Sequence, residues 1–234
     1  HTGENYLDAI ENYDCIIRSP GINTNTPEVK DKNVSSTTNI FFENCPGKTI
    51  GISGTKGKGT TSTFVYELLK KDGRDIRLVG NIGIPTLDEL ETADENTIFV
   101  VELSSFQLED CKYSPDIAVL LNMYPEHLDY HENFERYKRA KFNLLAHQDE
   151  NEILITNQEH ESIKDLVSKS KAKKIYYKNE ALENFTLPGK ANLENINAAI
   201  ACAKVLGISE ETISEFVSAV KPLPYRLEYI GKHK

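Results

Sequence analysis

One glycine-rich stretch, residues 49–63, constrains the fold of this chain more than any other feature. It reads Thr-Ile-Gly-Ile-Ser-Gly-Thr-Lys-Gly-Lys-Gly-Thr-Thr-Ser-Thr, and it begins with a short β-like run. The loop then leads into a helical pattern that ends at Gly73. A strand, a glycine-rich turn and a helix N-terminus suit a polyphosphate, because backbone N–H groups converge on the anion and the helix dipole favours it. The stretch therefore predicts a phosphate-binding loop.

The stretch departs from the usual P-loop pattern at two positions. That pattern is a glycine, four residues, and then Gly-Lys-Ser or Gly-Lys-Thr. Here Ile52 stands in the place of the first glycine, and Gly59 follows Lys58 where a hydroxyl is usual. The alternative interpretation is a glycine-rich turn capped by threonines. Glycines, two lysines and a run of hydroxyls at a strand–helix junction favour phosphate binding.

The rest of the chain repeats a rhythm of strand, loop and helix from Lys48 onwards. The predicted strands are residues 49–53, 76–79, 97–102, 117–122, 152–156 and 174–177. The predicted helices are residues 61–71, 134–147, 162–168, 192–206 and 209–220. Near-continuous apolar strands indicate a parallel sheet covered on both faces. We expect an α/β fold with a P-loop-type, doubly wound, mostly parallel sheet that binds its ligand at the carboxyl ends of the strands.

The ends of the chain differ from this central part. Residues 1–47 contain one strand (14–18), a helical patch (6–10) and a Pro-Gly break, which are too few elements for a core, so they predict a remnant of an N-terminal α/β domain. Residues 48–221 form the predicted central domain. Residues 222–234 begin with the rigid Pro-Leu-Pro and predict a linker to a further domain that is absent here.

Charge and cysteine content narrow the class of protein. The net charge is -9 and no basic block stands alone, which argues against nucleic acid or an anionic membrane as a partner. No apolar run is long enough to span a bilayer. The four cysteines are far apart without a C-x-x-C pair, so buried free thiols and a reducing compartment are expected. We predict a cytoplasmic monomer.

Two polar residues follow predicted strands, where such sheets place function. Glu102 ends an apolar strand, and its carboxylate could hold a Mg²⁺ that bridges nucleotide phosphates. The alternative is a helix N-terminal acid or a surface charge. His127 lies in the loop after the next strand, between Glu126 and Asp129. It could be a metal ligand, be oriented by one of these acids, or be an ordinary solvated histidine.

Lys141 lies in the middle of an apolar stripe. On the predicted helix 134–147 the stripe contains Phe134, Tyr137, Leu144 and Leu145, and Lys141 is four residues after Tyr137. A buried ammonium is costly unless it is paired, neutralised or modified. The alternative is that the flexible side chain reaches the surface. The sequence alone leaves both possibilities open.

These motifs together resemble the Mur ligase family. The matching stretches occur in family order and cover nearly the whole chain: residues 16–21, 51–61, 80–85, 102–109, 126–129, 137–141, 192–199 and 223–228. The Ser-Ser-Phe-Gln-Leu-Glu run and the Gly-Asn-Ile-Gly turn favour the D-glutamate-adding branch of the family. The resemblance implies the family's central ATP-binding domain, with parts of the domains on either side.

The resemblance also implies residue roles, which transfer position by position. Four residues would be catalytic: Lys58, His127, Lys141 and Arg226. ATP would lie against Gly54, Thr55, Lys56, Gly57, Lys58, Gly59, Thr60, Thr61 and Asn195. Mg²⁺ would be held by Thr60, Glu102, His127 and Lys141, the lysine being carbamylated. The muramoyl substrate would face Asn81, Ser104 and Gln107.

The implied activity is an ATP-dependent amide ligation in peptidoglycan synthesis. The carboxylate of UDP-N-acetylmuramoyl-L-alanine would be activated as an acyl phosphate, and the amine of D-glutamate would attack it. Two alternatives remain. The substrate could be that of a folylpolyglutamate synthase or of another Mur ligase, since Thr-Lys-Gly-Lys-Gly-Thr is close to the folylpolyglutamate synthase loop. The chain could instead be a nucleotide-binding unit that is inactive without a third domain.

Overall fold

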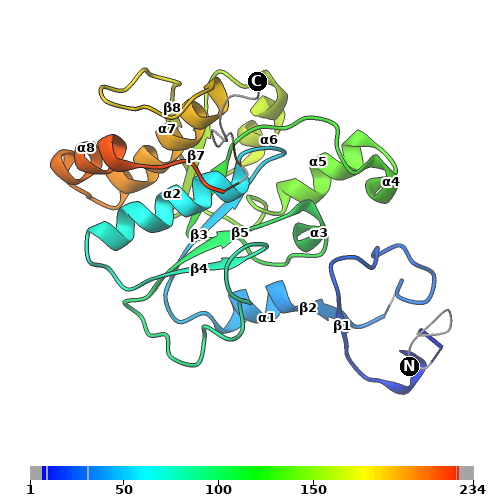
Figure 1. Ribbon diagram of the computed structural model, residues 1–234. Helices are drawn as coiled ribbons and strands as arrows, with labels where there is room; N and C mark the ends of the chain where they lie inside the picture. Colours follow the sequence, from blue (N-terminus) through cyan, green and yellow to red (C-terminus); the bar gives the residue numbers. More distant parts are fainter. Residues whose placement is uncertain (1–6, 9, 31, 225, 227–234) are drawn as a thin grey trace, which may run out of the picture.

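A six-stranded, wholly parallel sheet forms the centre of the molecule (Figure 1). The computed structural model describes residues 7–8, 10–30, 32–224 and 226. The strand order is β4-β5-β3-β6-β7-β8. The strands are β3 (Lys48–Ser53), β4 (Ile76–Gly80), β5 (Ile98–Glu102), β6 (Ile117–Leu120), β7 (Ile153–Asn157) and β8 (Lys173–Tyr177). The predicted fold class, a doubly wound parallel sheet, is confirmed.

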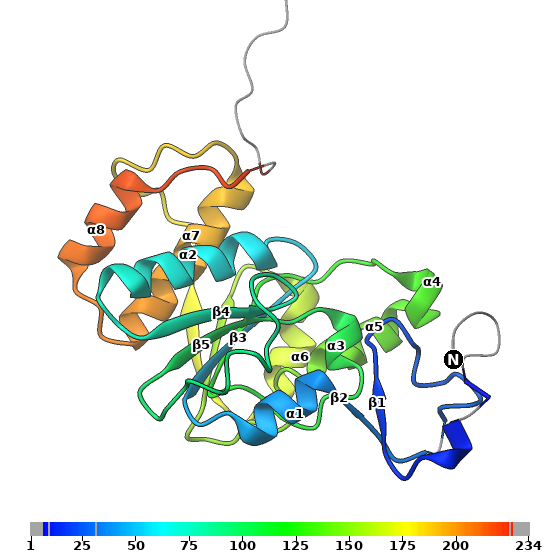
Figure 2. The same cartoon turned by 60° about the horizontal axis from the view of Figure 1, so that its bottom comes forward.

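Helices cover both faces of this sheet because its inner strands are apolar on both sides. One core lies between the sheet and α2 (Lys58–Lys71), α7 (Lys190–Val205) and α8 (Glu210–Ala219). The other lies under α3 (Ser105–Leu108), α5 (Phe134–Phe142) and α6 (Lys164–Lys169). Figure 2 shows the first group together on one side of the strands. The remaining short helices are η1 (Ile10–Asn12), α1 (Thr37–Asn44), α4 (Leu128–His131) and η2 (Glu161–Ile163).

Two predicted helix boundaries are wrong, and the backbone hydrogen bonds show why. The helix expected from Thr61 begins at Lys58, since Gly57 at its N-cap turns the chain with φ of 89°. The helix expected to reach His147 ends at Phe142. Beyond it the amides of Leu144 and Leu145 bond to carbonyls three residues back, so the apolar stripe continues in tight turns rather than in an α-helix.

The first part of the chain forms a small separate sheet. Strand β1 (Ile16–Arg18) pairs in parallel with β2 (Val34–Ser36), and α1 follows directly. Neither β2 nor α1 was predicted. Ser36 caps α1, since its side chain accepts from the amide of Asn39 at 3.3 Å. Serine is a preferred N-cap residue, so Ser36 was a signal for this helix in the sequence. Of the predicted helical patch 6–10, residues 6 and 9 lie outside the described residues, Leu7 and Asp8 form a turn, and Ile10 begins η1. The domain boundaries stay predictions.

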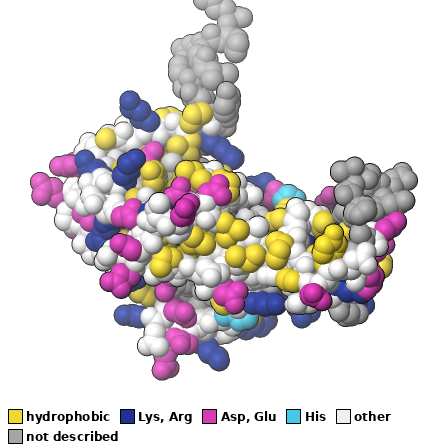
Figure 3. Space-filling view, turned by 90° about the horizontal axis from the view of Figure 1, so that it is seen from below, with side chains coloured by type: hydrophobic (Ala, Val, Ile, Leu, Met, Phe, Trp, Pro, Cys, Tyr) yellow, Lys and Arg dark blue, Asp and Glu magenta, His cyan; other side chains and the backbone are white. Residues whose placement is uncertain are grey.

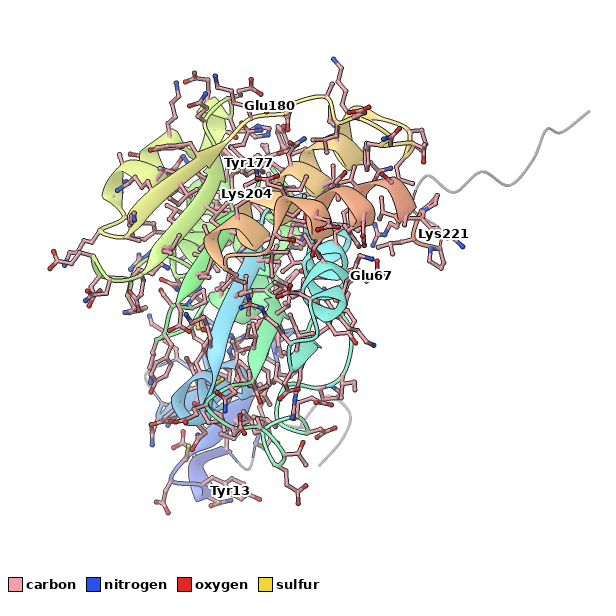
Figure 4. The ribbon with its side chains drawn as sticks, turned by 90° about the vertical axis from the view of Figure 1, so that its left-hand side faces the viewer. Tyr13, Glu67, Tyr177, Glu180, Lys204 and Lys221 are labelled. Atoms are coloured by element: carbon pink, nitrogen blue, oxygen red, sulfur yellow. The ribbon has the colours of Figure 1, made fainter. Side chains whose placement is uncertain are left out.

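Strand β8 is one edge of the large sheet, and α7 packs beside it. Figure 4 shows Tyr177 on this strand, Lys204 on α7 and Glu180 on the loop that joins the two. Acidic and basic side chains are interspersed over the face in Figure 3, so neither sign of charge dominates there. None of the helices within the described residues is long and apolar enough to cross a membrane.

Candidate functional site

The glycine-rich loop lies at the carboxyl end of β3, in the middle of the sheet, where it was expected. Hydrogen bonds from β6 and the chain after it fix its backbone. The amide of Thr55 donates to the carbonyl of Asn122 at 2.9 Å, and the amide of Lys56 donates to Oδ1 of Asn122 at 2.9 Å. Thr55 Oγ1 lies 2.8 Å from the hydroxyl of Tyr137. A loop held in this way presents preorganised N–H groups to an anion.

Gly57 is required where the loop enters α2. Its φ of 89° lies in the left-handed region, and a Cβ at this position would be 2.3 Å from Oδ1 of Asn195 on α7. Asn195 also accepts a hydrogen bond from Thr61 Oγ1 at 3.2 Å. The loop therefore packs directly against α7, and Asn195 lies beside the residues expected to hold the nucleotide phosphates.

Lys58 folds back over the loop. Its ammonium donates to the carbonyls of Gly54 and Thr55, both at 3.0 Å. Burial lowers the pKa of Lys58, the nearby charges of Glu102 and Glu126 oppose this, and the positive charges of Lys56 and Arg226 add to it. Lys56 itself is exposed and forms an ion pair with Glu126.

Glu102 ends β5 directly beside this loop. The residue is 3% exposed, and Oε1 accepts from Asn81 Nδ2 at 2.9 Å. Its other oxygen, Oε2, is buried with no hydrogen-bond partner among the residues that the structure describes. An unpaired buried carboxylate oxygen is costly unless a cation or donor meets it. The surface-charge interpretation of Glu102 is therefore wrong.

Gly59 makes room for that oxygen. A Cβ on Gly59 would lie 3.2 Å from Oε2 of Glu102, closer than most side chains allow. The next residue, Thr60, is 8% exposed in the first turn of α2. A carboxylate oxygen and a hydroxyl beside a phosphate-binding loop are the ligands that Mg²⁺ prefers, since this ion takes few protein ligands and completes its shell with phosphates and water. The residues present thus fit Mg²⁺.

Three or more metal-ligating side chains do not gather anywhere in the described part of the chain. His127 is 46% exposed at its side chain, and its Nε2 lies 3.8 Å from Oε2 of Glu126. Its ring packs on Phe106 with centroids 4.9 Å apart. The neighbouring acid and the aromatic ring orient His127 near the loop, and its role as a metal ligand stays a prediction.

Lys141 is fully buried against the loop. It is 1% exposed, and its ammonium donates to the carbonyl of Gly54 at 2.9 Å and to Ser53 Oγ at 3.2 Å. The alternative in which it reaches the surface is wrong. Burial lowers the pKa of Lys141 well below its usual value, and the charge of Lys58 lowers it further. The ammonium groups of Lys58 and Lys141 thus share one carbonyl, that of Gly54.

The remaining predicted residues lie near the loop or at the N-terminus of α3. Asn81 holds Glu102, as described above. Ser104 caps α3, and its amide and hydroxyl both donate to Oε1 of Gln107 at 2.9 Å. Arg226 is exposed, within electrostatic reach of Lys58. Asn122 and Tyr137 were not selected from the sequence as loop contacts, although Asn122 stands just beyond a strand, which is the signal that selected Glu102.

A family model for the Mur ligase middle domain matches residues 52–186. The chain belongs to the Mur ligase family. The matched region runs from the end of β3 to just before α7, so it includes the glycine-rich loop, Glu102 and Lys141. Residues 1–51 and 187–234, which contain α7 and α8, fall outside it.

Curated relatives are about a third identical to this Mur ligase chain over the aligned residues. A UDP-N-acetylmuramoylalanine–D-glutamate ligase of Geobacillus kaustophilus is 34% identical over 250 aligned residues, covering 95% of this chain and 55% of the relative. A ligase of the same name from Clostridium botulinum is 34% identical over 255, covering 97% and 56%. The chain therefore spans about half the length of the curated relatives it matches.

Solved structures of Mur ligases share the fold. A UDP-N-acetylmuramate:L-alanyl-gamma-D-glutamyl-meso-diaminopimelate ligase of Neisseria meningitides superposes with a TM-score of 0.67 at 17% identity, over 95% of this chain and 84% of the other. The MurF ligase of Thermotoga maritima, solved in complex with ADP, gives a TM-score of 0.64 at 21% identity, over 95% and 62%. At these identities the likeness supports the architecture alone.

Proposed function

We propose that this chain is the nucleotide-binding part of an ATP-dependent amide ligase that adds D-glutamate to UDP-N-acetylmuramoyl-L-alanine. The observation that carries the proposal is the meeting of three features at one loop: the folded-back Lys58, the unpaired oxygen of Glu102 and the buried Lys141. Curated relatives named for this reaction support the choice of substrates. We further propose that the protein is cytoplasmic and monomeric.

The loop would hold the phosphates of ATP. Lys58 would leave the carbonyls of Gly54 and Thr55 and turn its ammonium to the β- and γ-phosphates, while the loop amides donate to the same oxygens. Arg226 would add a second cation. Charge on the transferred phosphoryl group would then be neutralised without a covalent enzyme intermediate. Asn195 would approach the adenine from α7.

Glu102 Oε2 and the hydroxyl of Thr60 would hold Mg²⁺, with His127 as a further ligand. Bound Mg²⁺ supplies charge neutralisation between the phosphates. Asn81 keeps Glu102 in the rotamer that leaves Oε2 free. Asn81, Ser104 and Gln107 would contact the muramoyl substrate from the same end of the sheet.

The proposed reaction has two steps. The carboxylate of the substrate attacks the γ-phosphorus, the bond to ADP breaks, and an acyl phosphate forms. The amine of D-glutamate then attacks the acyl carbon, forms the amide and expels phosphate, with loss of a proton. The chain would supply charge neutralisation and alignment for both steps.

Lys141 would carry a carbamate in the active protein. Its lowered pKa favours the neutral amine. A neutral amine can attack CO₂ and lose a proton to give a carbamate anion. This modification would replace the second ammonium beside Gly54 with a negative charge that balances Lys58 and can help to position a metal. A carbamate signal in the NMR spectrum of protein in ¹³C-bicarbonate would support it, and Lys141→Ala should lose both signal and activity.

The decisive assay is phosphate release with UDP-N-acetylmuramoyl-L-alanine, D-glutamate and ATP, run with this chain and with the complete gene product. Release that needs all three substrates is expected from the complete product. Release with a folate substrate instead would favour the folylpolyglutamate synthase alternative. Titration calorimetry with ADP and Mg²⁺ tests the nucleotide-binding unit by itself, and absence of binding would refute every nucleotide role proposed here.

A further inference from the structure

Arg18 is a buried cation that the site described above does not use. It ends β1 and is only 2% exposed. Its Nη1 donates to three carbonyls of the turn that follows: Ser19 at 3.4 Å, Pro20 at 3.3 Å and Ile22 at 2.5 Å. The two N–H groups of this nitrogen are thus shared among the carbonyls of the turn, and the contact to Ile22 is the shortest of the three.

The other nitrogens of Arg18 bind α3 and the residues just after it. Nε and Nη2 form a forked pair with the carboxylate of Asp110 at 3.2 Å and 2.7 Å. Nη2 also donates to the carbonyl of Phe106 at 3.2 Å. Arg18 and Asp110 are 92 positions apart in the chain. One planar guanidinium therefore joins the turn after β1 to the central domain, in a geometry that a lysine cannot reproduce.

Tyr130 brings α4 into the same cluster. Its hydroxyl lies 2.8 Å from Oε2 of Glu109 and 3.1 Å from the carbonyl of Pro20. Its ring packs against Phe106 with centroids 4.5 Å apart, and Phe106 in turn packs on His127. Three segments distant in the sequence therefore meet around Arg18: the turn, α3 and α4.

The two helices need such a tie, because each contains only four residues. A single helical turn is not stable by itself in water, so its position depends on tertiary contacts. The short helix α3 begins at the Ser104 cap and contains Gln107, and α4 begins immediately after His127. The residues proposed to contact substrate and metal thus lie on or beside two short helices that Arg18 and Tyr130 connect to the turn after β1.

We propose that Arg18 is a positioning residue for the ligase reaction. It locks the turn Ser19–Ile22, α3 and α4 into one unit, so that Ser104, Gln107 and His127 keep a fixed placement relative to the phosphate loop. The hydrogen bonds of Arg18 go to none of the residues proposed to bind ATP, Mg²⁺ or the muramoyl substrate. The functional part of this proposal, the effect of Arg18 on the reaction, rests on the proposed ligase activity. The structural part, the joining of the turn to α3 and α4, does not.

The structural part is tested by hydrogen exchange on Arg18→Lys, which keeps the charge and loses the fork. Three amides report on the unit: Ile22, Leu108 and His131, which bond to Ser19, Ser104 and His127. We expect exchange at these amides to become at least about tenfold faster, while amides of β3 stay protected. Unchanged exchange at all three would overturn the proposal. Should Arg18→Lys fail to fold, Tyr130→Phe removes only the hydroxyl and should loosen the same amides.

The functional part is tested by steady-state kinetics of the complete ligase. In Arg18→Lys we expect the KM for the muramoyl substrate to rise about tenfold or more and the KM for ATP to rise clearly less, because His127 is the one residue of the unit proposed to act on the nucleotide. Equal rises in both KM values would overturn the positioning role. If the wild-type enzyme shows no ligase activity, the proposed function fails, and the exchange experiment still decides the role of Arg18.

A matched control is available on β4, an edge strand of the sheet. Arg77 on β4 is also largely buried and donates to the carbonyl and hydroxyl of Thr92 at 2.9 Å and 2.8 Å. Arg77→Lys should loosen its own loop and leave the Ile22, Leu108 and His131 amides and both KM values unchanged. The same kinetic split in this control would show that any buried arginine produces it.

Discussion

Replacing Lys141 with methionine should stabilise the protein. Methionine is unbranched, close to lysine in length and apolar, so it can fill the same space without the charge. Burial lowers the pKa of Lys141 well below its usual value of 10.5, which means that folding works against this ammonium. Replacing a buried ionic group by a well-packed apolar one typically stabilises a protein by about 1–4 kcal/mol.

The lost hydrogen bonds reduce this gain only a little, because both acceptors keep other partners. The carbonyl of Gly54 still accepts from Lys58 at 3.0 Å. Ser53 Oγ still donates to the carbonyl of Leu103 at 2.7 Å. Neither acceptor is therefore left without a partner, so the substitution carries no penalty for an unsatisfied buried group. We expect a net gain of about 1–3 kcal/mol, or roughly 2–12 °C in Tm for a chain of this size.

The pH dependence has a definite sign. Because the pKa of Lys141 is lower in the folded state, the unfolded chain binds the extra proton between that pKa and 10.5. Wild-type stability should therefore rise with pH in this window, and the advantage of Lys141→Met should shrink. Lys58, Glu102 and Glu126 also face this ammonium and are present in both proteins, so the difference between the two curves isolates Lys141.

The assay is thermal unfolding in CO₂-free buffer from pH 7 to pH 10. The control is Lys138→Met on the same helix, whose ammonium pairs with Glu135 at the surface and whose loss should give no gain. Adding bicarbonate should stabilise the wild type and leave Lys141→Met unchanged, since only the wild type can form the carbamate. A variant less stable than the wild type by about 1 kcal/mol or more at pH 7 would refute the reasoning.

Three further predictions concern the loop and the core. Gly57→Ala should lose about 1–3 kcal/mol in thermal unfolding, because the new Cβ meets Asn195 and φ is 89°; a neutral effect would mean that the loop can shift. Glu102→Gln should weaken ADP binding about tenfold in calorimetry with Mg²⁺ and very little with EDTA, and equal weakening in both would count against the metal role. Phe41→Ala should cost about 3–5 kcal/mol in urea unfolding, because this fully buried ring packs edge-on against Phe99; a small cost would show that α1 is not part of the core.

The sequence determined the architecture, and it predicted a candidate site at the carboxyl ends of the strands. Apolar runs with short strand lengths, each followed by a helical pattern, specify a parallel sheet by local periodicity alone, and all six predicted strands of that sheet are present. The glycine-rich loop was recognisable because its conformation depends on glycines that are close together in the sequence. Short elements without strong periodicity were not recognisable, because tertiary contacts decide whether they form; examples are β2, α3 and α4.

Only the tertiary structure decided which charged side chains are buried and which groups they contact. Lys141 could have reached the solvent, and its burial depends on contacts with Ser53 and Gly54, 88 and 87 positions away. Only the fold brings Gly59 beside the unpaired oxygen of Glu102. The space that this oxygen needs also explains why a glycine follows Lys58 where the usual pattern has Ser or Thr. Arg18 looks like an ordinary strand-end residue until Asp110 is brought to it. Burial and partnership of charges are long-range properties, so local sequence patterns cannot specify them.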